Sequence, residues 1–97
     1  MERNEISRHE VLVYQVLTEG KWVTNQEIAD RTGVAPRTAR AHTQKLVKLG
    51  LVDQAEVFPA HRYRLSEYAE KRNRGYADRI KRAAEIFGLT EADARIA

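Results

Sequence analysis

The segment from Gly33 to Val52 constrains the fold of this chain more than any other stretch of its 97 residues. Pro36 suits the first position of a helix, where its missing N–H is not needed, and Gly50 suits the left-handed residue just past a helix end. These two signals predict a helix over about residues 36–49. The residues that recur there at three- and four-residue steps, and that we expect to share the buried face, are Ala39, His42, Leu46 and Leu49.

The other faces of this predicted helix carry cations and hydrogen-bonding groups but no acidic residue. They bring four positive charges and consist of Arg37, Thr38, Arg40, Ala41, Gln44, Lys45 and Lys48. A cationic helix of about this length fits the major groove of duplex DNA. The competing interpretation of such a face is a solvated surface.

Two short helices are predicted before this segment. Ser7 caps the first, with Glu10 closing a capping box and Ile6 able to pack on Val11 as a hydrophobic staple. A second capping box, Thr24 with Glu27, opens the next helix, which ends in a turn at Gly33. This turn joins the second helix to the cationic helix, and the two form a helix-turn-helix whose second member is the cationic helix.

The extended stretch between the first two helices contains Trp22, which we expect to pack in the core or against a neighbouring hairpin rather than to stack on bases.

A β-hairpin is predicted directly after the cationic helix. Residues 51–58 and 61–65 alternate in polarity, with a turn at Phe58-Pro59-Ala60 between them. A hairpin in this position is a wing. Arg62 lies near its tip, together with His61, and we expect Arg62 to contact phosphate or the minor groove. For Arg64, contact with DNA and exposure to solvent are equally compatible with the pattern.

A helical pattern returns at Ser66, and Gly75 within it is a candidate for a kink or a break. A last short helix is predicted to start at Thr90. The apolar stripe of the longer helix exceeds what a small winged domain needs, so we expect a second copy to pair with it through Tyr76, Ile80, Ala83, Ala84 and Phe87. A longer intramolecular core is the alternative.

The predicted fold is therefore mainly α with a small β-hairpin wing. A winged helix-turn-helix domain would span residues 1–65, and a C-terminal helical segment over residues 66–97 would serve dimerisation.

Charge supports a polyanionic partner. Of the net charge of +3, residues 21–65 contribute +4 through eight basic and four acidic side chains. The chain has no Cys and no apolar run long enough to span a membrane, so we expect a cytoplasmic protein without disulfides.

His9, His42 and His61 are predicted to lie on separate elements with no orienting carboxylate. We therefore expect no catalytic site, no metal site and no cofactor.

The spacing of Gly33-Val34, Leu46 and Gly50-Leu51-Val52 resembles winged helix-turn-helix repressors of the MarR and ArsR type, over roughly residues 7–65. The resemblance departs at Ala35, where a capping Ser is common, at the small Ala39, and at Thr43, which replaces an apolar residue. It does not imply metal sensing, because the Cys pairs or Asp/His sets of the metal sensors are missing.

By position, the resemblance implies base contacts from the cationic helix, since Arg pairs with guanine and Gln with adenine. The candidates are Pro36, Arg37, Thr38, Arg40, Ala41, Gln44 and Lys45, with Lys48 nearer to phosphate or solvent.

The function expected from all of this is sequence-specific binding of double-stranded DNA by a homodimer on an inverted repeat, and the resemblance makes it a transcriptional repressor. A replication or partition factor of a plasmid or phage would use the same surface. The second class of function that the sequence allows is a winged-helix adapter that binds another protein. No small-molecule effector can be inferred.

Overall fold

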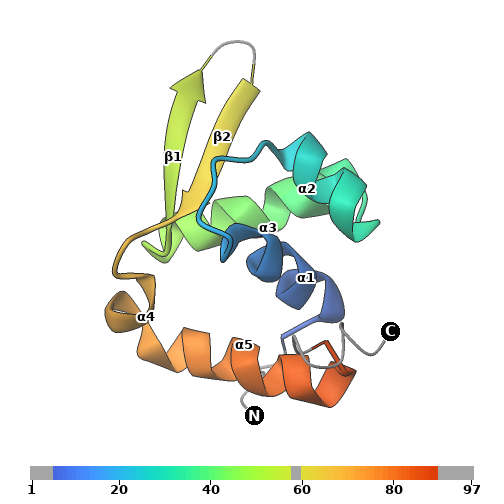
Figure 1. Cartoon of the computed structure of the whole chain (residues 1–97), viewed down its shortest axis with the longest axis vertical. Coiled ribbons are helices and arrows are strands. Elements are labelled where there is room, and N and C mark those ends of the chain that lie inside the picture. Colours follow the sequence, from blue (N-terminus) through green and yellow to red (C-terminus); the bar gives the residue numbers. More distant parts are fainter. Residues whose placement is uncertain (1–5, 58–59, 90–97) are drawn as a thin grey trace.

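The structure, a computed structural model, describes residues 6–57 and 60–89. Its elements are α1 (Arg8–Leu17), α2 (Asn25–Thr32), α3 (Pro36–Lys48), β1 (Val52–Val57), β2 (Ala60–Leu65), α4 (Ala69–Arg72) and α5 (Arg74–Phe87). The hairpin projects from one end of the helical body, and α4 and α5 lie at the opposite end (Figure 1). This confirms the predicted fold class, a helical domain with a β-hairpin wing. The predicted turn at Phe58-Pro59 and the last helix at Thr90 lie outside the described residues.

Local capping explains where the first two helices begin. Thr24 and Glu27 form the complete capping box, with hydrogen bonds of 3.1 and 2.8 Å. Ser7 also caps as predicted, because its hydroxyl accepts the N–H of Glu10 at 3.1 Å. The predicted return bond from the Glu10 side chain is wrong, since that carboxylate turns into the interior and binds partners on other helices.

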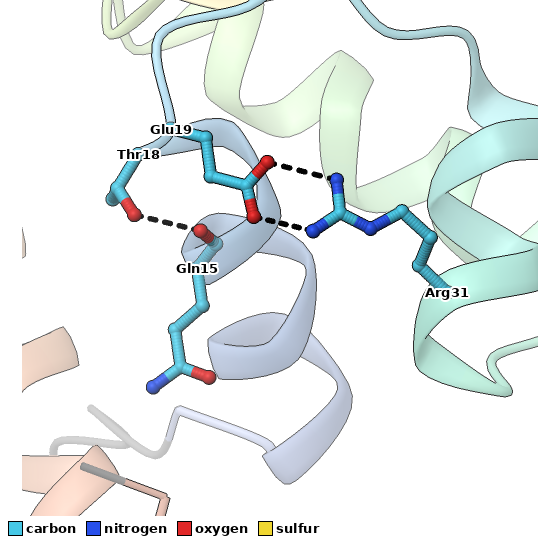
Figure 2. A network of polar contacts seen from close by, with 4 residues as sticks. All are labelled: Gln15, Thr18, Glu19 and Arg31. Carbon is cyan, nitrogen blue, oxygen red and sulfur yellow. Dashed lines mark hydrogen bonds and ion pairs between the residues drawn. The ribbon is translucent and has the colours of Figure 1, made fainter. Parts of the chain in front are cut away.

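Helices α1 and α2 are also joined at the protein surface, beyond the end of α1. The guanidinium of Arg31 donates two hydrogen bonds to the carboxylate of Glu19, and Thr18 donates to the carbonyl of Gln15 beside it (Figure 2). Hydrogen bonding from Arg31 lowers the pKa of Glu19. Because both side chains of the pair are exposed, it contributes little to stability.

Helix α3 begins at Pro36 and ends before Gly50, whose φ of 76° is left-handed. Its fully buried residues are Ala39, Thr43 and Leu46. The predicted face is wrong at Leu49, which is 36% exposed, and His42 is only half-buried. The core tolerates Thr43 because its hydroxyl lies 2.8 Å from Asn25 Oδ1 and 3.0 Å from the Arg40 carbonyl.

The wing is an antiparallel pair in which Val52 lies opposite Leu65 and Val57 opposite Ala60. Val23 joins its base, through two backbone hydrogen bonds to Tyr63 of 2.9 and 2.7 Å. Tyr63 therefore has a partner on each side of its strand, Gln54 on one side and Val23 on the other. Because strand residues alternate, His61 and Tyr63 face one side of the hairpin and Arg62 and Arg64 the other.

The C-terminal pattern breaks at Asn73 and not at Gly75. Asn73 has a non-helical backbone (φ −146°, ψ 71°), and its side chain accepts the N–H of Tyr76 at 3.1 Å. It thereby caps α5, and Gly75 lies in the first turn of that helix. The helix begins at this point because the Asn73 side chain satisfies a backbone N–H that would otherwise have no partner. Gly75 is accommodated inside the helix and does not break it.

Helix α5 packs along α1 (Figure 1), so its apolar stripe belongs to the core of its own chain. Tyr76 meets Tyr14 edge-on at 6.0 Å between ring centroids, and Gln15 donates a hydrogen bond to the Leu89 carbonyl. Of the residues assigned to dimerisation, Phe87 is 37% exposed and the buried ones are Tyr76, Ile80, Ala83 and Ala84. These four buried residues are part of the intramolecular core, which was the alternative to dimerisation.

Leu46 of α3 and Leu49, the residue directly after the helix, provide a test of how α3 packs. We expect Leu46→Ala to lower the free energy of unfolding by about 2–5 kcal/mol, because it leaves a cavity in the core. Leu49→Ala is the matched control and should change it by less than about 1 kcal/mol. Urea denaturation followed by circular dichroism measures both, and equal losses would contradict the observed face.

Candidate nucleic-acid interface

The outward surface of α3 is cationic. Arg37, Arg40, Ala41 and Lys48 are exposed, and Thr38 and Gln44 are half-buried. The helix contains no Asp or Glu between Pro36 and Lys48, so no acid on α3 itself offsets these charges. A narrow buried stripe leaves the rest of the helix free to contact a large partner.

An open groove of about 770 Å³ lies between this surface, the start of α2 and the wing. Its walls carry amide, hydroxyl, imidazole and guanidinium groups. They are formed by Thr24, Asn25, Gln26, Pro36, Arg37, Arg40, Gln44, Gln54, His61 and Tyr63. The groove brings together four of the predicted base-reading residues, Pro36, Arg37, Arg40 and Gln44. Thr38, Ala41, Lys45 and Lys48 are on α3 outside its lining.

The wing presents different residues to the groove from those that the sequence analysis favoured. His61 and Gln54 line it, with 3.3 Å between Gln54 Nε2 and His61 Nδ1. Arg62 lies on the opposite face of the hairpin, because it is one residue out of phase with His61 and Tyr63. Gln54 was missed, although its place opposite Tyr63 follows from the hairpin register.

The outer face of the wing holds a cation–aromatic pair. The guanidinium carbon of Arg64 lies 4.3 Å from the centroid of the Trp22 ring, and a terminal nitrogen of Arg64 lies 3.9 Å from an Asp53 carboxylate oxygen. Trp22 thus packs against the wing, which is one of the two positions predicted for it. With its guanidinium on this ring, Arg64 braces the base of the wing.

Two amide side chains tie α3 to its neighbours. Gln44 Nε2 donates to the hydroxyl of Tyr63 at 3.2 Å, on the wing, and Asn25 on α2 contacts Thr43. Asn25 was missed by the sequence analysis, since its partner lies 18 residues further along the chain. Both contacts lie at the groove and fix how α3 faces it.

Lys45 points away from the groove, toward α1. Its Nζ lies 2.7 Å from Glu10 Oε2 and 5.5 Å from the centroid of the Tyr76 ring. The same Glu10 oxygen accepts a 2.6 Å hydrogen bond from the Tyr76 hydroxyl. Burial, aided by the hydrogen bond to Glu10, raises the pKa of Tyr76, so its phenol stays protonated as a donor.

His42 lies on the same side of α3 and is half-buried. Burial lowers its pKa against the opposing charge of Glu10, which favours the neutral imidazole. Within residues 6–57 and 60–89, no three His, Asp or Glu side chains gather closely enough to hold a metal ion.

Comparison with known proteins places this geometry in a class. Residues 13–53, from within α1 to the start of β1, match the family described as winged helix-turn-helix DNA-binding. The described chain is thus a winged helix-turn-helix, as the resemblance indicated. No curated protein matches the sequence detectably.

Solved structures share this fold over most of the chain. The ST1889 protein of Sulfolobus tokodaii is 26% identical, with 84% of this chain and 82% of that chain covered and a TM-score of 0.64. The PcaV transcriptional regulator of Streptomyces coelicolor, solved with its natural ligand, is 19% identical, with 99% and 72% covered and a TM-score of 0.65.

A ZitR variant of Lactococcus lactis, solved in complex with DNA, is 16% identical, with 89% of this chain and 60% of that chain covered and a TM-score of 0.58. At these low identities the PcaV and ZitR matches establish the fold alone. None of the helices in the described ranges is long and apolar enough to cross a membrane.

Tyr14 and Tyr76, which pack edge to face, give a matched test of the hydrogen bond between Tyr76 and Glu10. Tyr76→Phe removes a hydrogen bond to a buried carboxylate and should destabilise the protein by about 1.5–3 kcal/mol. The buried hydroxyl of Tyr14 has no partner among the described residues, so Tyr14→Phe should be neutral or stabilising. Chemical denaturation of both variants measures the difference, and a larger loss for Tyr14→Phe would refute the assignment.

Proposed function

We propose that this chain is a sequence-specific, double-stranded DNA-binding protein that regulates transcription, acting as a repressor in the cytoplasm. The observation that carries the proposal is the acid-free outward surface of α3, with Arg37 and Arg40 on the wall of a groove that the wing completes. A polyanion is the partner that such a surface attracts. The match of residues 13–53 to winged helix-turn-helix DNA-binding proteins and the fold shared with the PcaV regulator support it.

In this proposal α3 enters the major groove and each contact has a chemical role. Arg37 and Arg40 can donate bidentate hydrogen bonds to guanine, and Gln44 can pair with adenine after releasing Tyr63. Pro36, Thr38 and Ala41 contribute shape and apolar contact. Lys48 and Arg62 would contact phosphate, which positions the protein without reading sequence.

A homodimer on an inverted repeat, with half-sites about one helical turn apart, is the assembly that we propose. The support lies at the end of α5, where Ile86 is 74% exposed beside Phe87. Large exposed apolar side chains at a helix end favour burial against a second copy. In this assembly Tyr76, Ile80, Ala83 and Ala84 stay in the core of their own protomer, and Phe87 belongs to the interface.

Charge reversal on α3 tests DNA binding. We expect the unmodified chain to bind random duplex DNA with an affinity that falls steeply with salt, because binding releases counterions. Arg37→Glu/Arg40→Glu should abolish that binding. Fluorescence anisotropy with a labelled duplex at two salt concentrations measures both.

The matched control is Arg72→Glu/Arg74→Glu, which changes the net charge equally on exposed residues of α4 and α5, away from the groove. It should bind nearly as well as the unmodified chain. If the unmodified chain failed to bind at low salt, the DNA-binding proposal would be wrong, and a pull-down for a protein partner would test the adapter function. If it binds, a selection from random sequence would yield the target site and its symmetry.

A further inference from the structure

We infer, resting on the proposed function, that Glu10 is a positioning residue of the DNA-binding surface. Its carboxylate holds Lys45 away from DNA and thereby sets the rotation of α3 against α1. Lys45 thus anchors α3 to α1 and does not read bases.

The acidic partner in this contact is buried, so it depends on the groups that bind it. The Glu10 side chain is 5% exposed, whereas that of Lys45 is 48% exposed. A carboxylate withdrawn from water needs a counter-charge and hydrogen bonds, and Lys45 and Tyr76 supply them at one oxygen. The Tyr76 ring, 5.5 Å from the Lys45 ammonium, adds a second attraction on the same side.

The position of Lys45 on α3 agrees with this role. Residues spaced by three or four positions share a helix face, so Arg37, Arg40 and Gln44 form one row, and all three line the groove. Lys45 lies on the flank beside that row and reaches α1. While it is bound to Glu10, its ammonium cannot also meet a phosphate or base at the groove.

The structure therefore divides the four cations of α3 into two kinds. Arg37, Arg40 and Lys48 are exposed and add positive charge to the surface that meets DNA. Lys45 is neutralised by Glu10 and adds almost none. Each phosphate contact contributes about 0.9 to the slope of the logarithm of the binding constant against the logarithm of the salt concentration, so this slope reports which cations meet DNA.

The test measures that slope for the full chain and a set of variants on duplex DNA. Lys45→Gln should keep the slope of the unmodified protein, whereas the matched control Lys48→Gln removes a proposed phosphate contact and should make the slope shallower by about 0.9. Glu10→Gln frees the ammonium of Lys45 and should steepen the slope by up to about 0.9. In Glu10→Gln/Lys45→Gln the slope should return to that of the unmodified protein.

Several outcomes would overturn the inference. A fall in slope for Lys45→Gln equal to that of Lys48→Gln would make Lys45 a phosphate ligand in the unmodified protein. An unchanged slope for Glu10→Gln would show that Glu10 does not hold Lys45 away from DNA. Circular dichroism monitors folding of each variant. If Lys45→Gln alone unfolds because it strands Glu10, the double variant decides, since its slope would still fall if Lys45 met DNA.

The same data separate this inference from the proposed function. The proposed function depends on salt-sensitive binding by the unmodified chain, and the positioning role depends on differences between variants. If the unmodified chain did not bind DNA, both proposals would be wrong. If it bound DNA but the variants did not differ as expected, only the positioning role of Glu10 would be wrong.

Discussion

The structure depends on how little of α3 is buried. Only Ala39, Thr43 and Leu46 of this helix are fully enclosed, and the remaining surface is left to solvent or a partner. Three side chains, one of them polar, supply modest hydrophobic anchoring for a helix of 13 residues. A helix held so narrowly could roll about its own axis, and that rotation has to be fixed by other means.

Three consecutive side chains of α3 fix its rotation, because each contacts a residue on a different element. Thr43 contacts Asn25 on α2, Gln44 donates to Tyr63 on β2, and Lys45 pairs with Glu10 on α1. Hydrogen bonds are directional, so together they specify an orientation that apolar contact alone would leave loose. The pairing of Lys45 also joins α3 to α5, because Tyr76 shares the Glu10 oxygen.

Sequence alone could predict what is encoded locally. The bounds of α3 followed from Pro36 and Gly50, and the start of α2 from its capping box, because each signal acts within one turn of the backbone. What failed depends on distant partners. Glu10 has the spacing of a capping residue, yet its partners lie 35 and 66 residues away. The cap at Asn73 was missed in favour of Gly75, which has the more familiar breaking character. Periodicity left the buried Thr43 out of the inner face of α3, although the resemblance placed it at an apolar position.

Near the base of the wing, Tyr63 pairs with Gln54 within the two-stranded sheet and with Val23 through an isolated bridge. A residue inserted there would shift the register by one and exchange the two faces of the hairpin. His61 would then leave the groove, and Arg64 would lose Trp22. Homologues can thus be expected to vary in wing length only beyond this point, with the base of the hairpin kept at constant length.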